Sequence, residues 1–545
     1  MTGGWPTRDS HQRAERAGRL ALGIALALAV ALAACGTAAS PAPSPQPTAT
    51  PQPTAAPTVQ PSPSPPPSPT PTGAAFEPGP CRFGAIPGET VECGDLLVPE
   101  DRAQAGGRTI RLAVAIIRSH AANPAPDAFI FLSGGPGVPA VAGAGELARV
   151  FKRVLATRDL IVFDQRGVGY STPSLDCLEW DAALANISME DLDPEEATAR
   201  EVEVYQACHD RLVQDGVNLA AYHSAASAAD VNDLRLALGY GQVNLYGVSY
   251  GSRLALTVLR DFPAGIRSVV LDSVLPPQVD FYADLGSNAQ RALDVLFQRC
   301  AADAQCGAAF PALETEFYEL VDQLSAEPVP FNVPGAAGGE PGQFLLDGDR
   351  LITALFNLLY DSSEIFWLPK TIAELAHGYY TGHFYQVLPK VMAMWASAYI
   401  SDGMNRSVMC AEEVPFHSAE ALAAASAGLN PHVAASFERP PASVLAVCDF
   451  WGAGEAPAVE NEPVASDLPV LILAGEFDPI TPPASGQLAA QTLSRSVYYE
   501  FPGVGHQVIG ARTCAMDIAI SFLEAPGSAP DASCMQKLKM GFVVH

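Results

Sequence analysis

Short apolar runs alternate with helical segments along most of this 545-residue chain, and the alternation limits the fold more than any other feature. Continuous apolar strands separated by helices indicate a parallel sheet that is buried on both faces. We therefore expect an α/β fold with a mostly parallel central sheet and helices on both sides. The predicted strands occupy residues 109–119, 127–137, 158–171, 242–247, 266–277, 468–483 and 496–506, and the clearest helices occupy 227–240 and 249–263.

The pattern of predicted secondary structure changes between about residue 278 and residue 460. Helical stretches such as AQRALDVLFQRC and ALETEFYELVDQLSAE dominate there, and no clear sheet strand appears. This pattern predicts a long, mainly helical insertion between two strands of one sheet. We expect a first core part at 77–277, the insertion at 278–460 and a second core part at 461–545.

The stretch NLYGVSYGSRLAL places Ser249 between two glycines, where a predicted strand meets a predicted helix. A bare G-x-S-x-G pattern is weak evidence in a chain with 45 glycines, but this junction is the context of a nucleophile elbow. Such a sharp turn needs small neighbours, which Gly247 and Gly251 supply. The free N–H groups at the start of the helix favour a developing negative charge. We therefore interpret Ser249 as a candidate nucleophile.

A serine hydroxyl needs a base to take its proton, and the base needs an acid to orient it. His506 follows the last predicted strand in PGVGHQ, and Asp478 follows the preceding one in AGEFDPITPP. Both lie at the carboxyl ends of strands, as Ser249 does, so the order Ser, Asp, His predicts a catalytic triad. Asp272 in VVLDSV, at the end of another strand, is the alternative acid.

The tetrahedral intermediate formed on Ser249 would need two N–H donors for its oxyanion. We expect the first from the backbone of Tyr250, the residue after the nucleophile. We expect the second from Gly135, in the glycine loop FLSGGPG (131–137), because glycines there let a backbone N–H approach the substrate. A plain glycine turn is the alternative interpretation of this loop.

The first 76 residues read as export and tethering signals rather than as part of the fold. Arg13, Arg16 and Arg19 precede an apolar run over 20–34, which is short for a membrane span and typical of a signal peptide. The run ends in LAACG, which resembles a bacterial lipobox and implies cleavage after residues 1–34 and lipidation of Cys35. An ordinary signal peptide with an incidental cysteine is the alternative. Residues 35–76, rich in Pro, Ser and Thr, predict an extended stalk on the extracytoplasmic face of the cell membrane.

Ten cysteines remain when the predicted lipidation site is set aside. An exported chain meets an oxidising compartment, so we expect five disulfides, although the sequence alone does not fix their pairing. Pairing in chain order closes the shortest loops and is our prediction: 81–93, 177–208, 300–306, 410–448 and 514–534. No C-x-x-C pair or histidine cluster has zinc spacing, so we predict no metal. The net charge of −28 repels phosphate backbones and argues against nucleic acid as a partner.

Six segments lie in the same order here as in a known family: GGPG, DQRGVGYS, VNLYGVSYGSRLAL, VVLDSV, AGEFDPITPP and GVGH. They resemble α/β-hydrolases of the proline iminopeptidase and tripeptidyl aminopeptidase type, as do VMCAEEVPF and AVCDFWG. The resemblance implies a helical cap over the active site, hydrolysis through an acyl-enzyme, no cofactor, and cleavage of peptides from a free amino end. Two features depart from the pattern: Ser133 stands where a His is often found, and GVPAVAG follows Pro136 instead of a Gly-Gly-Ser run. Both adjoin the oxyanion loop and leave the substrate open.

An exopeptidase that acts at an amino terminus must bind an ammonium group, and a carboxylate in the insertion would do this. Glu412 and Glu413 are the candidates, with a surface acidic pair as the alternative. Three functions follow from the sequence. The first is a serine exopeptidase acting on peptides, and the second is an esterase or other small-acyl hydrolase with the same triad. The third is a non-catalytic tethered binding protein, against which the complete set of Ser249, Asp478 and His506 argues. The oligomeric state stays open.

Overall fold

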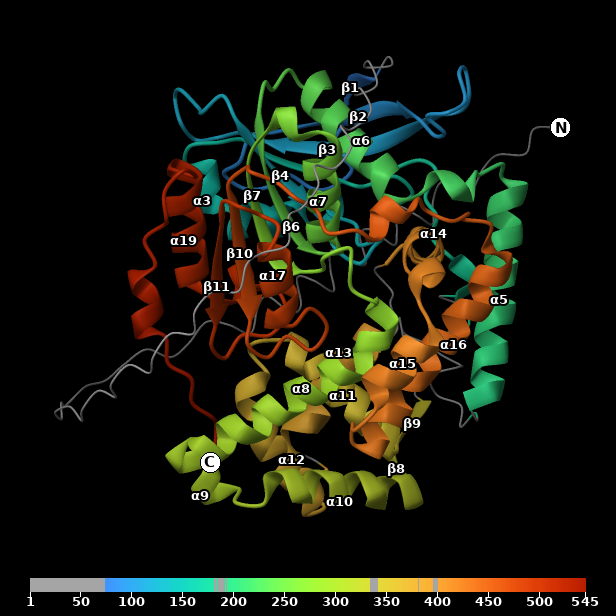
Figure 1. Ribbon diagram of the computed structural model, residues 1–545, viewed down its shortest axis with the longest axis vertical. Helices are drawn as coiled ribbons and strands as arrows, with labels where there is room; N and C mark the ends of the chain where they lie inside the picture. Colours follow the sequence, from blue (N-terminus) through green and yellow to red (C-terminus); the bar gives the residue numbers. More distant parts are fainter. Residues whose placement is uncertain are drawn as a thin grey trace, which may run out of the picture. The chain divides into compact units, whose positions relative to one another are not determined.

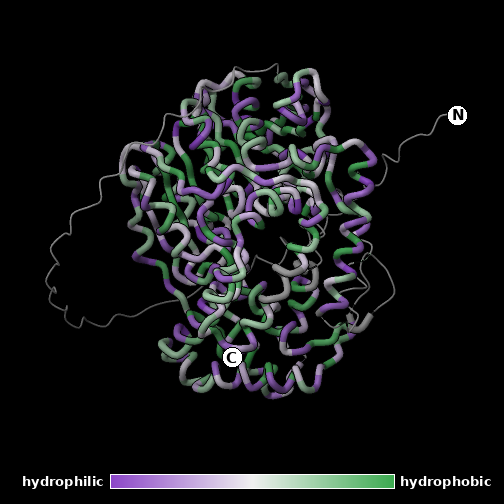
Figure 2. The backbone as a smooth tube through the Cα atoms, turned by 45° about the vertical axis from the view of Figure 1, so that its right-hand side comes forward, coloured by the Kyte–Doolittle hydropathy of each residue, from purple (hydrophilic) through white to green (hydrophobic). Residues whose placement is uncertain are grey.

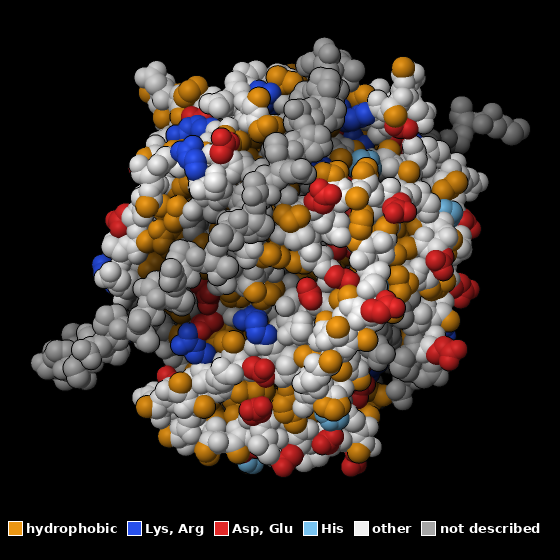
Figure 3. All heavy atoms as spheres, viewed as in Figure 1, with side chains coloured by type: hydrophobic (Ala, Val, Ile, Leu, Met, Phe, Trp, Pro, Cys, Tyr) orange, Lys and Arg blue, Asp and Glu red, His pale blue; other side chains and the backbone are white. Residues whose placement is uncertain are grey.

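The computed structural model describes residues 74–545 apart from 181–182, 184–191, 193, 334–341, 381 and 396–399. The predicted signal peptide, Cys35 and nearly all of the predicted stalk lie outside the described residues. Within the described ranges, no helix combines the length and the hydropathy that a membrane span requires. On the face seen in Figure 3, acidic side chains are spread over the right-hand and lower parts, as the large negative charge of the chain leads one to expect.

A nine-stranded sheet forms the centre of the fold (Figure 1). Neighbouring strands from β5 through β11 are parallel, whereas β1, β2, β3 and β5 pair antiparallel with one another. The prediction of a mostly parallel sheet is confirmed. Neither β1 nor β2 was predicted, because neither has the continuous apolar run that marks the other strands. In spatial order the strands are β1 (Ala75–Gly79), β2 (Val91–Pro99), β3 (Thr109–Ile117), β5 (Leu160–Phe163), β4 (Ala128–Leu132), β6 (Val243–Ser249), β7 (Ile266–Val274), β10 (Val470–Gly475) and β11 (Ser496–Phe501).

Helices cover both faces of the sheet, as predicted (Figure 1). α7 ends at Asp261, two residues before Pro263, which cannot continue a helix. α6 begins at Ser224 rather than near Ser227, because the imidazole of His223 accepts the N–H of Ala226 and caps the helix. One face carries α6 (Ser224–Ala237), α7 (Tyr250–Asp261) and α17 (Pro483–Ala490), and the other carries α2 (Ala144–Val150), α3 (Lys152–Leu155), α18 (Val508–Ala511) and α19 (Thr513–Glu524).

Between β7 and β10 the chain forms mostly helices, which bury a hydrophobic core of their own. In Figure 2 the outer helices alternate hydrophilic and hydrophobic residues along their length, the pattern of helices with one buried face. A two-stranded antiparallel sheet of β8 (Val329–Val333) and β9 (Gly342–Leu346) was not predicted, since five-residue strands leave little periodicity. The helices are α8 (Phe281–Ala302), α9 (Ala304–Ala309), α10 (Leu313–Ala326), α11 (Gly348–Tyr360), α12 (Leu368–Ala376), α13 (His383–Trp395), α14 (Asp402–Glu412), α15 (Ala419–Ser426) and α16 (Pro431–Trp451).

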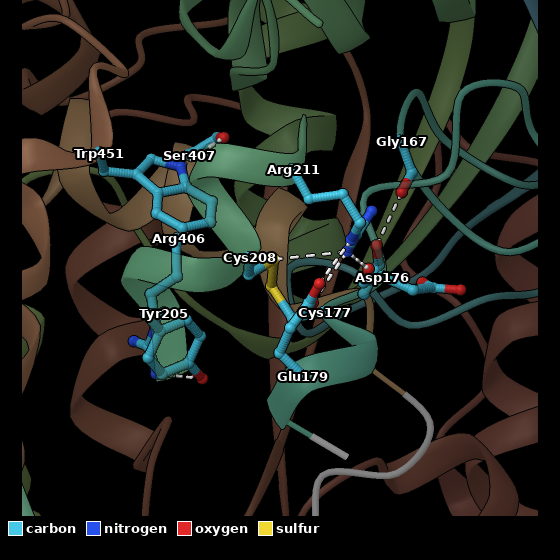
Figure 4. Close-up of a disulfide and its surroundings, with 11 residues drawn as sticks. Gly167, Asp176, Cys177, Glu179, Tyr205, Cys208, Arg211, Arg406, Ser407 and Trp451 are labelled. Carbon is cyan, nitrogen blue, oxygen red and sulfur yellow. Dashed lines mark hydrogen bonds and ion pairs between the residues drawn. A yellow bond between two sulfur atoms is a disulfide. The ribbon is translucent and has the colours of Figure 1, made fainter. Parts of the chain in front are cut away.

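Five disulfides link the ten cysteines, and all follow the chain-order pairing that the loop-length argument predicts. The Cys177–Cys208 bond joins α5 (Pro194–Gln214) to the segment that follows β5 (Figure 4). The Cys410–Cys448 bond joins α14 to α16. The remaining bonds are Cys81–Cys93, Cys300–Cys306 and Cys514–Cys534.

Candidate active site

Ser249 is the last residue of β6, and α7 begins at the next residue. Its backbone has φ 57° and ψ −129°, a conformation that residues other than glycine seldom adopt. A Cβ at Gly247 would lie 2.2 Å from the carbonyl oxygen of Gly251, and a Cβ at Gly251 would lie 2.1 Å from that of Leu132. Both positions therefore require glycine, and the strand–turn–helix arrangement predicted around Ser249 is present.

The imidazole of His506 contacts the carboxylate of Asp478, with 2.8 Å between Nδ1 and Oδ2. Asp478 is fully buried, and its Oδ1 accepts the N–H groups of Ile480 and Thr481. Burial disfavours the imidazolium, but the Asp478 carboxylate outweighs this effect and raises the pKa of His506 above 6.5. Burial also opposes ionisation of Asp478, yet His506 and the two N–H groups keep its pKa below 3.8. An ionised carboxylate thus accepts Nδ1–H and leaves Nε2 as the basic nitrogen.

The loop that carries His506 is held by the helical segment as well as by the sheet. The N–H of His506 donates to the carbonyl oxygen of Tyr360 at 3.0 Å, and the N–H of Gly505 donates to the Ser362 hydroxyl at 3.0 Å. A Cβ at Gly505 would lie 2.1 Å from the carbonyl oxygen of Leu359, so the end of α11 closes tightly on this loop. Sequence reasoning missed these residues, because only the folding of the chain brings them to the histidine.

Asp272, the alternative acid, contacts the same loop from the sheet side. Its Oδ1 accepts the N–H of Val508 at 2.8 Å, and its Oδ2 accepts the N–H of Ile509 at 2.9 Å and the hydroxyl of Tyr246 at 2.7 Å. Burial raises the pKa of Asp272. Asp272 therefore holds the start of α18, while Asp478 accepts the hydrogen bond that the imidazole Nδ1–H donates.

The glycine loop after β4 passes directly beside Ser249. A Cβ at Gly134 would lie 3.0 Å from the Cβ of Ser249, and Gly135 has φ +111°, which favours glycine. The loop is also fixed from α14, because the Asn405 amide donates to the carbonyl oxygen of Pro136 at 3.2 Å. Gly135 and Tyr250, the two predicted oxyanion donors, border one cavity, as donors to a single oxyanion must.

This cavity has a volume of about 390 Å³, and we call it the acyl cavity. It lies between the glycine loop, the start of α7 and the helices α5, α8, α11, α14 and α16. Three charged side chains, Glu201, Arg406 and Glu413, interrupt a largely apolar lining. Glu201 and Arg406 were not predicted as site residues, because isolated charges on helices give no distinguishing pattern. The apolar lining includes Leu275, Leu285, Phe356, Val408, Phe437 and Ile480.

The predicted pair Glu412 and Glu413 separates into two roles. Glu412 is fully buried, does not line the acyl cavity, and accepts the N–H and the hydroxyl of Ser224, the latter at 2.7 Å. Glu413 lines the cavity and forms an ion pair with the buried Arg253 of α7. Burial outweighs the attraction of Arg253 and raises the pKa of Glu413 to about 7. Both carboxylates are buried, so the interpretation of this pair as a surface acidic pair is wrong.

Within the part of the chain that the structure describes, no group of three or more His, Cys, Asp or Glu side chains is arranged to hold a metal ion.

Two families of known proteins match parts of the chain. Residues 127–296 match the family described as alpha/beta hydrolase fold, and residues 434–534 match the family described as TAP-like protein. The first match contains Ser249 and the glycine loop, and the second contains Asp478 and His506. Residues 297–433 lie between the two matches, and every site residue outside this segment lies in a matched one.

Curated relatives with different named activities also resemble the chain. The serine protease Hip1 of Mycobacterium tuberculosis is 32% identical over 262 residues, covering 45% of this chain and 49% of the relative. The tripeptidyl aminopeptidase of Streptomyces lividans is 31% identical over 199 residues, covering 35% and 36%. Carboxylesterase B of Mycobacterium tuberculosis is 28% identical over 457 residues, covering 82% and 86%. The match spans about half the length of the Hip1 relatives.

Proposed function

The chain is an α/β-hydrolase with a TAP-like C-terminal region, and we propose that it is a serine exopeptidase that releases residues or short peptides from free amino termini. The observation that carries the proposal is the Glu413 carboxylate, which lines the acyl cavity bordered by Gly135 and Tyr250 beside Ser249. A buried carboxylate in an apolar cavity suits an ammonium group, whereas a neutral acyl chain gains nothing from it. The relatives named as a serine protease and a tripeptidyl aminopeptidase support the same choice.

The proposed reaction begins when Nε2 of His506 takes the hydroxyl proton of Ser249 and the serine oxygen attacks the scissile carbonyl. The N–H groups of Gly135 and Tyr250 stabilise the oxyanion of the tetrahedral intermediate. The imidazolium, paired with Asp478, then protonates the leaving amine, and an acyl-enzyme forms on Ser249. Water activated by the same histidine hydrolyses the ester and frees the amino-terminal product.

Arg253 has a positioning role in this proposal. It is buried on α7, the helix that starts at the nucleophile, and it pairs with Glu413. The disulfide at Cys410 and the hydrogen bonds of Glu412 to Ser224 fix the end of α14 from two further directions. Core elements therefore fix the position of the Glu413 carboxylate relative to Ser249. An exopeptidase needs this fixed separation, because it determines how far from the amino terminus the peptide is cleaved.

The location proposed for this reaction is the extracytoplasmic face of a membrane. Five disulfides in the described part of the chain favour an oxidising compartment. The lipobox-like sequence before Cys35 and the Pro-rich stretch at 35–76 would supply the tether and the spacer. Palmitate labelling that is lost in a Cys35→Ala variant would test the anchor.

An esterase or other small-acyl hydrolase is the second candidate, favoured by the relative named carboxylesterase B, which matches 82% of this chain. Matched peptides with free and N-acetylated amino ends separate the two functions. For the exopeptidase, N-acetylation should lower kcat/KM by about 10- to 100-fold, since a hydrogen-bonded charge contributes about 1.5–3 kcal/mol.

A Glu413→Gln variant should lose the preference for the free amine and keep its turnover of nitrophenyl esters. The matched control is Glu420→Gln, because Glu420 is an exposed carboxylate on α15, and this change should leave the preference intact. Equal turnover of free and acetylated peptides by the unaltered protein would contradict the exopeptidase and favour the esterase.

A further inference from the structure

Arg406 is the cation of the acyl cavity, and it lies on α14 opposite α5. Its guanidinium lies over the ring of Tyr205, with Cζ 4.5 Å from the ring centroid, and its Nη2 donates to the Tyr205 hydroxyl at 3.0 Å (Figure 4). The preceding residue, Asn405, bonds to Pro136 in the glycine loop. Arg406 therefore lines the same cavity as the predicted oxyanion donors Gly135 and Tyr250.

The surface under Arg406 is rigid. Tyr205 is 2% exposed, stacks on Trp180 at 4.9 Å and meets the edge of Trp451 at 6.3 Å. Trp451 is itself fixed, because its indole N–H donates to the Ser407 hydroxyl at 3.0 Å (Figure 4). The Cys177–Cys208 disulfide anchors α5 three residues after Tyr205. A platform of this kind holds the guanidinium in one orientation before any ligand binds.

The charge of Arg406 has no direct counterion among the residues that the structure describes. Its one hydrogen bond there goes to a neutral hydroxyl; Nε is buried without a partner, and no described residue bonds to Nη1. The carboxylates of Glu201 and Glu413 line the same cavity, and the carboxylate of Asp402, one turn earlier on α14, attracts the guanidinium electrostatically. None of these three carboxylates forms an ion pair with Arg406. A guanidinium cannot lose its proton, so an enclosed one favours an anionic ligand.

We propose that Arg406 binds an acidic side chain, Asp or Glu, within the amino-terminal residues of the peptide that enters the acyl cavity. The inference rests on the proposed function, because it assumes that the amino-terminal part of the peptide occupies this cavity. Glu413 takes the ammonium group, and the fork of Arg406 takes the carboxylate. The apolar lining holds the rest of the acyl part. The preferred substrate is then a peptide with a free amino end and an acidic residue close to it.

Binding to a Ser249→Ala protein tests the inference without turnover. The ligands are pentapeptide amides with a free amino end and Glu or Gln at position 1, 2 or 3, so that the side chain is the sole carboxylate. At one of these positions we expect Glu to bind about 10- to 100-fold tighter than Gln by calorimetry, the range for a hydrogen bond to a charged group. An added Arg406→Met change should remove this preference, so that Glu and Gln peptides bind equally.

Two further variants control for a structural effect. Arg406→Lys keeps the charge but not the fork, and it should retain part of the preference. Arg149→Met removes an exposed arginine outside the cavity and should retain all of it. Equal binding of Glu and Gln peptides, or a preference that survives Arg406→Met, would overturn the inference. Peptides with a free carboxyl end form a separate arm, and tighter binding of these alone, without a side-chain effect, would also overturn it.

Turnover by the protein with Ser249 intact separates this inference from the proposed function. Cleavage of free-amine peptides without a Glu preference would support the exopeptidase and refute the Arg406 site. A Glu preference that depends on Arg406, without cleavage of any free-amine peptide, would support the carboxylate site and refute the exopeptidase.

Discussion

Replacing Asp478 by Asn should remove most of the activity and leave the fold intact. The N–H groups of Ile480 and Thr481 both donate to Oδ1, so the amide oxygen of the Asn would stay with them and its NH₂ group would face His506. That NH₂ group is a donor and cannot accept Nδ1–H, so the imidazole proton would move to Nε2. Nε2 could then no longer take the proton of Ser249. We expect kcat to fall by about 10⁴-fold, the size of a wrong-tautomer effect in a Ser-His-Asp triad.

The matched variant is Asp272→Asn, which changes the alternative acid in the same way. Its carboxylate accepts four hydrogen bonds, from the N–H groups of Val508 and Ile509 and from the hydroxyls of Tyr246 and Ser273. An amide keeps one accepting oxygen, so at least one of these donors is left unpaired at a cost of about 1–3 kcal/mol of folding free energy. The imidazole keeps its bond to Asp478, so kcat should fall by less than about tenfold.

Hydrolysis of a nitrophenyl ester is the right assay for both variants, because it does not depend on recognition of an amino terminus. Thermal unfolding should show a lower Tm for Asp272→Asn and a smaller change for Asp478→Asn. The reasoning is refuted if Asp272→Asn is the inactive protein and Asp478→Asn keeps its turnover within tenfold of the unaltered protein.

Three other outcomes follow from the site. The kcat/KM should rise with pH through a limb centred above 6.5 and then level off, because protonated His506 cannot accept the Ser249 proton. A flat profile between about pH 5 and 9 would exclude His506 as the base. Ser362→Ala should lower kcat by up to about tenfold without moving that limb, and Ser362→Thr should restore it, since only the support of the histidine loop is lost. The pKa of Glu413 is raised from 4.5 to about 7, so between these pH values Glu413 is protonated in the folded protein and ionised in the unfolded chain. The free energy of unfolding should therefore fall by up to about 3 kcal/mol as the pH rises across this range. Denaturation measured at several pH values should show this slope, and Glu413→Gln should remove it.

The central sheet and the nucleophile elbow at Ser249 could be predicted from the sequence, because each depends on a local sequence pattern. The buried strands β4, β5 and β10 are continuous apolar runs, and β6 and β7 are mostly apolar with a few polar residues. The turn at Ser249 carries the glycines that its backbone requires. His506 and Asp478 were found because each follows a strand directly, so their position at the sheet edge depends only on strand direction.

Other parts of the site depend on contacts that no local pattern records. Glu412 and Glu413 are neighbours of the same type, and only tertiary contacts place one against Ser224 on α6 and the other in the acyl cavity. Arg406 and Tyr205 lie on helices about 200 residues apart in sequence, and their stacking follows from how these helices pack. The imidazole of His223 caps α6, so this helix begins at Ser224 and not at the predicted residue 227, because an imidazole nitrogen can also accept a backbone N–H.

The most direct test of the central claim is a digest of a mixed peptide library, read by mass spectrometry, with the Ser249→Ala protein as the control. The account predicts that the unaltered protein shortens peptides from their free amino ends, leaves N-acetylated peptides intact, and loses both effects when Ser249 is replaced. Internal or carboxyl-end cleavage, equal loss of acetylated peptides, or no cleavage at all would contradict it.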